Sequence, residues 1–544
     1  MRVSPEAPAE TPPLPRRVLA GLLLALFTVS FNVQVMTVLM VPIARDLGTT
    51  LASVQNALVL TSLVAFAFVP TSRRLGSIYG YRRVFAVGLV IFSLGLLATA
   101  ASPNALVLIP SYGILTGLGS STLVTLPWML VSRSATGLER DLGHFLLVMA
   151  IVGGSLVGPL IGGLVNSSST WHWAFLLPLP LVLLVWYLVR AAGEVIENPG
   201  SRVDWAGATL SFAGMALLLL GTTFSSEYGW WQPLRTVRLG RFSIPPFTLS
   251  IVPLLLAAGA ILLLIFTLRW HRSARRDDKI QMWQLGALRQ VQFDIGLLTS
   301  MLFAVASAGL TYMLYMFLQG SSTFALTSFE AAITVLPYNL AVVLVLAATL
   351  LLGRRVAPKY VIQLGLLITI LGLWILSRAF GPDATPTGLI PGLVVIGAGG
   401  GLVIGQVGPL TLSIAGEDRA SEGRGLFNSV QDLSHAVGIA VFGYVLINAM
   451  SAAVVDSVLG AVDFPITDAQ RIELIEEVER SAETMSGEEL EQLWGQLADE
   501  EAEALVSLLG GPENKSMQQA LGGVSVVLGM GFLVSLFLPK HRVV

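Results

Sequence analysis

The chain has 544 residues, of which 54% are hydrophobic and only 12% are charged, with a formal net charge of −2 and a mean hydropathy of +0.76. Soluble proteins carry about a quarter charged residues, so this composition excludes an ordinary soluble enzyme, and the absence of a basic excess excludes a nucleic-acid binder. Cys is absent, which excludes disulfides, thiolate catalysis and Cys-based metal sites. The sequence therefore predicts an all-α integral membrane protein.

The first fifteen residues contain five prolines and are predicted to form a disordered lead-in. After them, fourteen segments are apolar over about 20 residues, the length that a helix needs to cross the bilayer core. These predicted spans run near 17–43, 52–72, 83–102, 105–131, 142–165, 171–190, 204–224, 247–268, 291–319, 328–352, 360–379, 387–413, 424–450 and 519–539.

The distribution of basic residues predicts the orientation of these spans. An even number of spans puts both termini on one side of the membrane. If that side is the cytoplasm, 24 of the 32 Lys and Arg residues lie inside and the other eight lie outside. This is the positive-inside bias, so we expect both termini to be cytoplasmic.

Two segments on the outer side have distinct patterns. Residues 451–518 hold 16 of the 34 acidic residues, and capping boxes at Thr467 and Ser486 predict two short amphipathic helices there. We interpret this segment as a solvated helical hairpin; an acidic vestibule that attracts cations is the alternative. Residues 238–241, Arg-Leu-Gly-Arg, fit a small hairpin turn.

The span 142–165 has glycines that recur every fourth residue. Gly154, Gly158 and Gly162 clear one helical face, so that a neighbouring helix can approach closely. Pro159 removes one hydrogen bond of the helix and allows it to bend. Such faces also pack static membrane helices, but glycines beside a kink favour a helix that moves against its partner. The predicted conformational motif in this span comprises Gly154, Gly158, Pro159, Gly162 and Gly163.

Other motifs follow the glycine motif in a fixed order along the chain. They are Trp171-x-Trp173-x-Phe175, Val203-Asp204-Trp205-x-Gly207, Phe317-Leu318-Gln319, Leu336-Pro337, and Asn428 with Gly438. With this set, the chain resembles the fourteen-helix drug:proton antiporter (multidrug efflux) branch of the major facilitator superfamily, over nearly its whole length except the acidic segment and the tail. The resemblance implies two pseudo-symmetric six-helix bundles with two linker helices inserted between them and a substrate cavity at the midplane. It also implies a location in a prokaryotic cytoplasmic membrane. The resemblance adds Gly80, Arg82 and Arg83, in the loop after the second span, to the predicted conformational motif.

This organisation divides the chain into six parts. They are a disordered N-terminus at 1–15, an N-terminal six-helix bundle at 16–190, two linker helices with a cytoplasmic connector at 191–290, the C-terminal bundle helices 9–13 at 291–450, the acidic extracytoplasmic loop at 451–518, and helix 14 with the cytoplasmic tail at 519–544.

The chain departs from the family at the residues that usually couple transport to protons. The resemblance implies a carboxylate in the first span, an Arg in the fourth span and an Asp in the loop after the second span. Asn32, Gly113 and Ser77 occupy these positions. Asn and Gly do not titrate, so the usual coupling pair is absent and the proton-coupling motifs are degenerate.

The span 424–450 contains ionisable residues that could replace this pair. Asn428, Asp432 and His435 lie on one helical face. Ionisable residues inside a membrane are functional candidates, so we expect Asp432 and His435 to be partners in proton coupling; a cluster at the helix end is the alternative. Glu330, at the start of the span 328–352, is a third candidate, although its position fits the outer interface better.

Polar and aromatic residues near the middle of the spans are candidates for lining the substrate cavity. Their neighbours are mostly apolar, which suits lipophilic or amphiphilic molecules better than sugars. A hydrogen bond between helices is an equal alternative for each of them. The candidates are Asn32, Gln34, Tyr312, Tyr315, Tyr338, Asn339, Gln406 and Asn428.

The sequence therefore predicts a monomeric, alternating-access secondary transporter that exports hydrophobic or amphiphilic compounds, with possible proton coupling through the span 424–450. The expected partners are such a substrate or a lipid, membrane lipids and protons. One alternative is a lipid or lipid-linked substrate carrier or an uncoupled facilitator, and a second is a transporter-like sensor or scaffold. No cofactor is implied, and no nucleophile–base or metal arrangement supports an enzyme.

Overall fold

The computed structural model describes most of the chain at the level of individual residues. The described residues are 15–134, 137–194, 196, 205–223, 237–239, 242–244, 250–274, 290–352, 356–381, 384–414, 420–462, 470–471, 474 and 499–540. The predicted lead-in therefore lies outside them, except for Pro15.

The N-terminal bundle consists of the six predicted spans, some of which are broken into shorter helices. Residue 39 interrupts the first span, and residue 177 precedes a proline that divides the sixth. In the fourth span, the middle segment Ile109–Thr116 is a π-helix, η1. The elements are α1 (Arg16–Val38), α2 (Met40–Asp46), α3 (Leu51–Tyr79), α4 (Tyr81–Ala100), α5 (Ala105–Leu108), η1, α6 (Gly117–Ser134), α7 (Gly137–Ser168), α8 (Trp171–Leu176) and α9 (Pro178–Val189).

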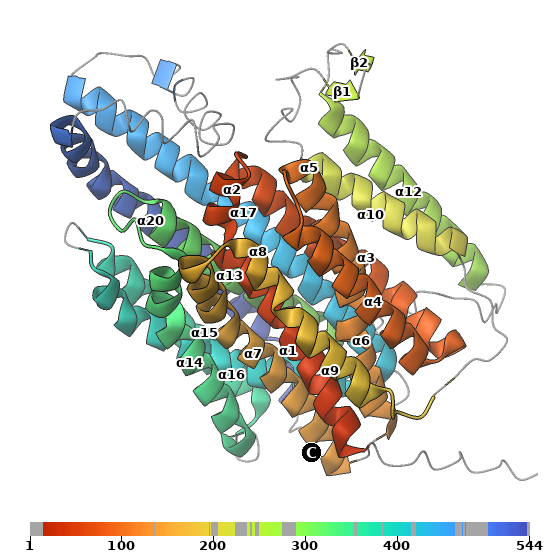
Figure 1. Ribbon diagram of the computed structural model, residues 1–544. Helices are drawn as coiled ribbons and strands as arrows, with labels where there is room; N and C mark the ends of the chain where they lie inside the picture. Colours follow the sequence, from red (N-terminus) through yellow and green to blue (C-terminus); the bar gives the residue numbers. More distant parts are fainter. Residues whose placement is uncertain are drawn as a thin grey trace, which may run out of the picture.

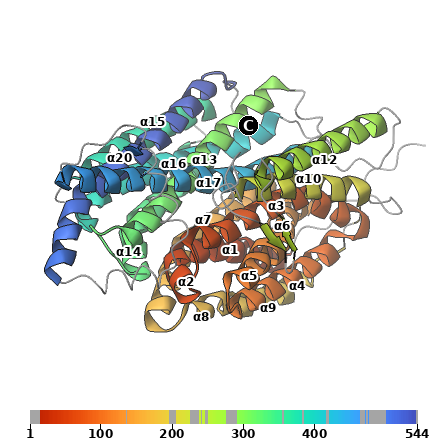
Figure 2. The same cartoon turned by 90° about the horizontal axis from the view of Figure 1, so that it is seen from above.

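The C-terminal bundle repeats this plan with longer helices. Its elements are α13 (Val291–Gly320), α14 (Ser328–Leu352), α15 (Pro358–Ala379), the 3₁₀-helix η3 (Pro386–Leu389), α16 (Ile390–Ile414), α17 (Ala420–Val462) and α20 (Asp499–Ser535). Figure 2 shows the two groups of helices side by side. The all-α membrane fold with two bundles is thereby confirmed.

Two helices lie between the bundles in sequence and beside them in space. α10 (Trp205–Thr223) and α12 (Ile251–Ala274) pack mainly on each other, and α10 also contacts α3 (Figure 1). They are joined through a hairpin of β1 (Val237–Leu239) and β2 (Phe242–Ile244), in which Leu239 pairs with Phe242. This pairing leaves two residues for the turn, as expected for a tight hairpin at this position.

The expected count of fourteen spans is not confirmed. Among the described residues, twelve helices are long and apolar enough to cross a membrane. The two linker helices carry shorter apolar segments, Thr209–Leu218 and Ile251–Phe266. A segment of about 20 apolar residues is the usual requirement, so α10 and α12 fall short of it by this measure.

The last two helices differ from their predicted boundaries. α17 continues to Val462 rather than ending near 450, and α20 begins at Asp499 rather than near 519. The extension of α20 is too polar for a span, so a search for apolar segments misses it. The extension of α17 is largely apolar, with Asp456 as its one charged residue, and the apolar pattern does not mark where the helix ends. Figure 1 shows the two ends projecting from the C-terminal bundle. The two amphipathic helices predicted within 451–518 fall almost entirely outside the described residues.

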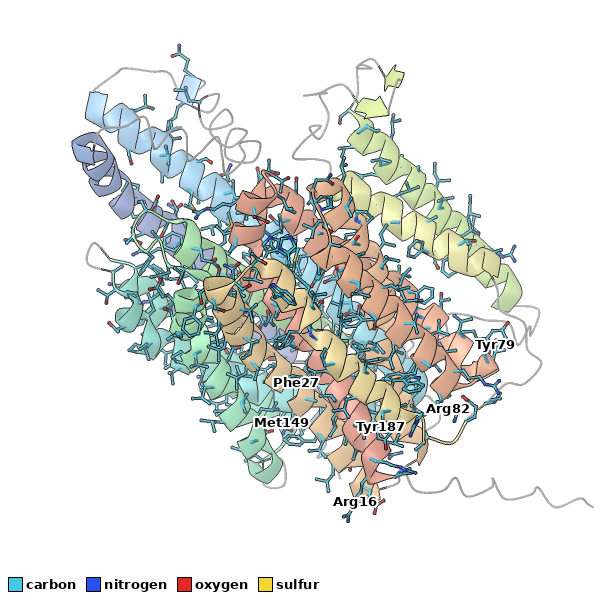
Figure 3. The ribbon with its side chains drawn as sticks, viewed as in Figure 1. Arg16, Phe27, Tyr79, Arg82, Met149 and Tyr187 are labelled. Atoms are coloured by element: carbon cyan, nitrogen blue, oxygen red, sulfur yellow. The ribbon has the colours of Figure 1, made fainter. Side chains whose placement is uncertain are left out.

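All spans run between two ends of the molecule, which we name from the chain. The terminus end holds Arg16 and Lys540 and the connection from α3 to α4, whereas the far end holds the turn from α2 to α3 and the β-hairpin (Figure 1). The side chains of Arg16, Tyr79 and Arg82 lie at the terminus end (Figure 3). Every span therefore has a defined direction, which is used below to assign its residues to a level in the molecule.

The predicted glycine face of α7 lies against α1, inside the N-terminal bundle. A Cβ atom at Gly158 would lie 2.7 Å from the carbonyl oxygen of Phe31, and one at Gly162 would lie 3.3 Å from the side chains of Val35 and Val38. The two backbones can approach this closely only because these positions have no side chain. Dispersion at close range is a main source of helix association in lipid, since lipid tails are as apolar as the side chains.

The C-terminal bundle uses the same kind of contact between α17 and α13. A Cβ at Gly438 would meet the carbonyl oxygen of Val305 and, at 3.1 Å, the Cβ of Ala308. α17 is the counterpart of α7, and α13 is the counterpart of α1, when each bundle is counted from its first span. The pseudo-symmetry implied by the resemblance therefore extends to the packing of individual helices.

We expect Gly158→Ala to lower the free energy of unfolding by about 1–3 kcal/mol, because the added methyl group would force α7 away from α1. Gly522→Ala on α20 is a matched control, since a Cβ at Gly522 would have no atom within 4 Å. Ala also favours a helix over Gly, so the control is expected to be neutral or slightly stabilising. Thermal unfolding of both variants in detergent measures the difference; equal midpoints would contradict the packing role of Gly158.

Candidate transport pathway between the two bundles

The bundles meet along two helix pairs, α3 with α17 and α7 with α14. Near the middle of the first pair, the Oγ of Ser62 on α3 lies 3.3 Å from the Nδ1 of His435 on α17. This hydrogen bond joins the bundles at one of the residues predicted to handle protons. His435 therefore faces the opposite bundle and not the lipid.

Asp432 lies one helical turn from His435, toward the terminus end. It shares the helical face of His435, as the spacing predicts, but the two side chains do not form an ion pair with each other. His435 is instead bonded to Ser62, and Asp432 has no hydrogen-bond or ion-pair partner within the described part of the chain. The two side chains therefore do not contact each other directly, and their joint role in proton coupling stays a prediction. The carboxylate is half-buried and unpaired, which is costly inside a membrane unless water or a ligand reaches it.

At the far end, amide side chains join the bundles. Gln55 on α3 accepts a hydrogen bond of 2.8 Å from the Tyr312 hydroxyl on α13, and Gln319 on α13 donates one of 3.0 Å to the carbonyl oxygen of Val38 on α1. Tyr312 was predicted to line the substrate cavity and is instead fully buried in this contact. Gln55 was missed because a lone Gln in the first turns of a span carries no distinctive sequence signal.

At the terminus end, a cation and an aromatic ring join the bundles. The guanidinium of Arg424, at the start of α17, lies 4.3 Å from the ring centroid of Trp128 on α6. The Trp128 ring is 5.5 Å from the ring of His144 on α7, whose Nε2 lies 3.0 Å from the Oγ of Ser132. A cation over a Trp ring in a desolvated setting is a strong contact, so this cluster holds α17 against the N-terminal bundle.

Apolar side chains close the middle of the second helix pair. Val152 of α7 packs with Val342 and Leu346 of α14 in one buried cluster. At the far end of this pair, a Cβ at Gly163 would lie 2.7 Å from the Cα of Phe329 on α14. Gly163 thus differs from the other glycines of its motif, because it faces the opposite bundle.

Asn32 lies deep in the N-terminal bundle. It is 1% exposed, and both its amide oxygen and its amide nitrogen lack a hydrogen-bond partner in the described structure. The hydroxyl of Tyr112 on η1 approaches the backbone carbonyl of Asn32 at 3.4 Å instead. Buried polar atoms normally have partners, so the Asn32 amide is a site where a water or a ligand group would gain hydrogen bonds.

Gly113, where the resemblance implies an Arg, lies in a closely packed position. Gly113 lies in η1, and a Cβ there would be 2.6–3.0 Å from the Leu60 side chain of α3. Thr61, beside Leu60, donates a hydrogen bond of 3.0 Å to the carbonyl oxygen of Tyr112. π-helical turns leave backbone carbonyls poorly aligned, and here a neighbouring hydroxyl satisfies one of them. The Leu60 side chain of α3 therefore fills the space that an Arg side chain at position 113 would need.

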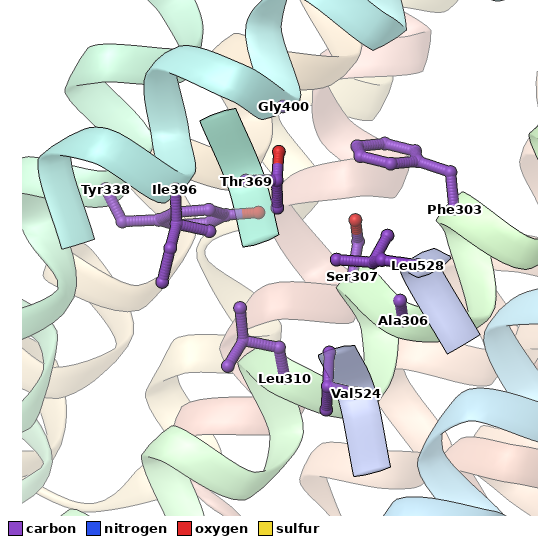
Figure 4. Close-up of a pocket in the computed structure, with 10 residues that line it drawn as sticks. All are labelled: Phe303, Ala306, Ser307, Leu310, Tyr338, Thr369, Ile396, Gly400, Val524 and Leu528. Atoms are coloured by element: carbon purple, nitrogen blue, oxygen red, sulfur yellow. The ribbon is translucent and has the colours of Figure 1, made fainter. Parts of the chain in front are cut away.

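Three aromatic and amide candidates gather on α13 and α14. The Tyr315 hydroxyl lies near Tyr338 and Asn339. Tyr338 lines a small cavity of about 10 Å³ inside the C-terminal bundle, together with Ser307 and Thr369 (Figure 4). This volume holds about one water molecule, so Tyr338 does not border a space large enough for a substrate there.

The remaining cavity candidates are dispersed among several helices. Gln34 is half-buried beside Gly158, and Gln406 on α16 is buried. Asn428 is also buried, and its amide nitrogen has no partner in the described structure. Asn428 lies one turn from Asp432 on the same face of α17, so α17 carries two candidates whose hydrogen-bonding capacity is unused.

Glu330 lies at the far end in the first turn of α14. Its carboxylate accepts hydrogen bonds of 2.9 Å from both the backbone N–H and the hydroxyl of Thr327. These are the contacts of a helix cap, and the side chain is exposed. The structure therefore places Glu330 outside the interface between the bundles.

The loop motif after α3 is held by Glu194, which follows α9 and which sequence reasoning missed. Glu194 accepts hydrogen bonds from the backbone N–H and the Nε of Arg82, at 3.1 and 3.2 Å, and lies 3.8 Å from the Nε of Arg83. Gly80 has a φ of +102°, and a Cβ there would collide with the Glu194 carboxylate. Gly80 is thus required both for its conformation and for this close approach.

We expect Gly113→Arg to reduce folded protein sharply and not to restore a coupling pair, because Leu60 occupies the space. Overpacking of this kind costs about 1–3 kcal/mol or more. Combining it with Leu60→Ala is expected to recover part of the loss. The yield of monodisperse protein in detergent and its thermal midpoint measure both effects, and a Gly113→Arg variant as stable as the parent would contradict this account of the packing at Gly113.

Comparison with known proteins identifies the family. The sequence profile described as the Major Facilitator Superfamily matches residues 22–439. Two solved transporters have the same fold, at 14–15% identity. The human organic anion transporter MFSD10 aligns with a TM-score of 0.55, and the alignment covers 97% of this chain and 100% of that transporter. A POT family transporter bound to a thioalcohol-conjugated peptide has a TM-score of 0.58, with 85% and 93% covered.

Curated relatives are similar over most of their length. A probable actinorhodin transporter of Streptomyces coelicolor is 28% identical over 78% of this chain and 71% of its own. The cephamycin export protein CmcT of Amycolatopsis lactamdurans is 28% identical over 76% of this chain and 82% of its own length. The multidrug resistance protein Stp of Mycobacterium tuberculosis is 25% identical over 81% of this chain and 78% of its own length. With this profile match over most of its length, and with relatives named as drug and antibiotic exporters, the chain belongs to the major facilitator superfamily of secondary membrane transporters.

Proposed function

We propose that this protein exports lipophilic or amphiphilic small molecules by alternating access and that Asp432 couples export to protons. The observation that carries the proposal is the position of Asp432. Its unpaired carboxylate lies on the face of α17 whose next turn, at His435, contacts the opposite bundle. The surroundings of a carboxylate in this place change whenever the two bundles rock against each other.

A carboxylate at this level has two states with different preferences. The neutral form tolerates a closed apolar interface, whereas the charged form requires water, a cation or a polar partner. Proton binding therefore favours closure around Asp432, and proton release favours opening toward water. His435 supports this role, because its hydrogen bond to Ser62 ties the same helical face to the N-terminal bundle.

Among its described residues, the N-terminal bundle has no carboxylate at this depth. Asn32 stands where the resemblance implies a carboxylate and cannot titrate, and Gly113, where the resemblance implies an Arg, is packed against Leu60. Proton coupling, if it operates in this chain, must therefore rely on the C-terminal bundle. The resulting arrangement places the ionisable group on α17 and neutral hydrogen-bonding groups on α1.

The class of substrate follows from the side chains near the interface and from the relatives. The candidates on α1, α13 and α17 are amides and phenols among apolar neighbours, with Asp432 as the charged exception. Such a surface favours molecules with large apolar areas and a few hydrogen-bonding groups. Relatives named for actinorhodin, cephamycin and multiple drugs support a drug or antibiotic of this kind as the substrate.

We expect Asp432→Asn to lower gradient-driven transport of a lipophilic fluorescent dye by at least about tenfold, because Asn cannot bind and release a proton. The measurement is dye uptake into inside-out vesicles with and without a protonophore. Glu330→Gln is the matched control, since Glu330 is an exposed cap residue, and it should keep the transport rate within about twofold. If the dye flux changes neither when the proton gradient is collapsed nor in the Asp432→Asn variant, the result would contradict proton coupling and would support an uncoupled carrier.

We further propose that the terminus end faces the cytoplasm of a prokaryotic cell. The natural chain lacks Cys, so single Cys variants can be labelled without background. Leu106, at the far end, is 84% exposed, and Tyr79, at the terminus end, is 51% exposed. In intact cells, a membrane-impermeant maleimide should label Leu106→Cys, and it should label Tyr79→Cys only after permeabilisation. The reverse pattern would overturn the orientation.

A further inference from the structure

Gln55 belongs to one bundle, but both ends of its side-chain amide form hydrogen bonds with the other bundle. Its Oε1 accepts a hydrogen bond of 2.8 Å from the Tyr312 hydroxyl on α13. Its Nε2 donates a hydrogen bond of 3.2 Å to the carbonyl oxygen of Ile439 on α17. Both functional ends of the amide therefore bind the C-terminal bundle, while its backbone belongs to α3 of the N-terminal bundle.

A missing side chain on α17 makes room for this amide. Gly443 lies one helical turn beyond Ile439, and a Cβ there would be 2.6 Å from the Nε2 of Gln55 and 3.0 Å from the Cε1 of Tyr312. Any larger residue at 443 would occupy the place of the amide. Gly443, Ile439 and Tyr312 thus form a notch between α17 and α13, which we call the Gln55 notch.

The Gln55 notch lies toward the far end, where other contacts also cross between the bundles. Gln319 binds the carbonyl oxygen of Val38 at 3.0 Å, and Gly163 lies against the backbone of Phe329. Each of those contacts meets one helix of the opposite bundle, whereas the Gln55 side chain binds two of them, α13 and α17. The bundles cannot separate at this end while the amide stays in its notch.

The chemistry of Gln55 suits a contact that must form and break. Its hydrogen bonds are to a phenol and a carbonyl oxygen, and both partners are neutral. When the far end opens, water can replace these bonds at little net cost, whereas a buried charge pair would leave an uncompensated charge. When the far end closes, water leaves and the same bonds are remade in a medium where nothing competes with them.

We propose that Gln55 is the positioning residue that latches the far end in its closed state and that its amide leaves the Gln55 notch each time this end opens. The inference rests on alternating access between two bundles, but not on the identity of the substrate or on proton coupling. Gly443 is the matching half of the latch, because it admits the amide. Loss of either half should shift the equilibrium toward a state that is open at the far end.

The test measures distances between spin labels in the purified full-length protein, by pulsed electron–electron double resonance in nanodiscs. The lack of natural Cys allows two double-Cys pairs at exposed positions, one at each end of the molecule. The far-end pair is Leu106→Cys with Thr387→Cys, and the terminus-end pair is Tyr79→Cys with Tyr360→Cys. No substrate or gradient is needed, so failure of this test is distinct from failure of the export proposal.

We expect Gln55→Ala to raise the ratio of long to short far-end distances by about tenfold, since two hydrogen bonds are lost. The terminus-end distance should stay the same or shorten. Gln363→Ala is the matched control, because Gln363 also donates to a backbone carbonyl, that of Ser535 at 3.2 Å, but within the C-terminal bundle. If Gln55→Ala proves hard to fold, Gln55→Met retains the length of the side chain and removes only its hydrogen bonds.

Gly443→Ala should produce the same shift as Gln55→Ala, because the methyl group displaces the amide. Gly523→Ala is its control, since a Cβ there would make only an ordinary contact of 3.5 Å with Phe442. The double variant Gln55→Ala with Gly443→Ala should show no further shift, because an empty notch accepts the methyl group. Unchanged far-end distances in both single variants, or equal shifts in the two controls, would overturn the proposal.

Discussion

The structure depends on how closely its helices can approach in a solvent that does not drive them together. Lipid tails are as apolar as the side chains, so the helices gain little from burying apolar surface and rely instead on close packing and on hydrogen bonds. Glycines allow close packing at three kinds of interface. Gly158 lets α1 approach within one bundle, Gly438 lets α13 approach within the other, and Gly443 leaves room for a side chain from the opposite bundle. The first two hold each bundle together, and the third lies where the bundles must part.

The contacts between the bundles differ in chemistry from one end to the other. Neutral amides, Gln55 and Gln319, cross at the far end, a cation over an aromatic ring, Arg424 with Trp128, crosses at the terminus end, and His435 with Ser62 crosses between them. A transporter that alternates must break one set while it keeps the other. The contacts named here are of moderate strength and none of them is a buried pair of full charges, so they allow this without trapping either state.

Much of this fold follows from the sequence because the bilayer permits few solutions. A span of about 20 apolar residues must be helical, so the twelve spans and the two-bundle plan were predictable from hydropathy and motif order. The exact helix ends were not predictable, since the apolar pattern does not mark where α17 ends and the polar first turns of α20 lie outside any apolar segment. Site residues were only partly predictable: the shared face of Asp432 and His435 follows from helical spacing, but the partner of His435 is on another helix.

What the sequence determined by itself is local: which segments span, which faces lack side chains, and which titratable groups lie at mid-depth. Only the tertiary structure decided which helix each face meets. It paired His435 with Ser62 rather than with Asp432, packed Leu60 against Gly113, and brought Gln55 into the opposite bundle. The physical reason is that such contacts join residues hundreds of positions apart, such as Gln55 and Ile439, and one-dimensional periodicity carries no information about the partner.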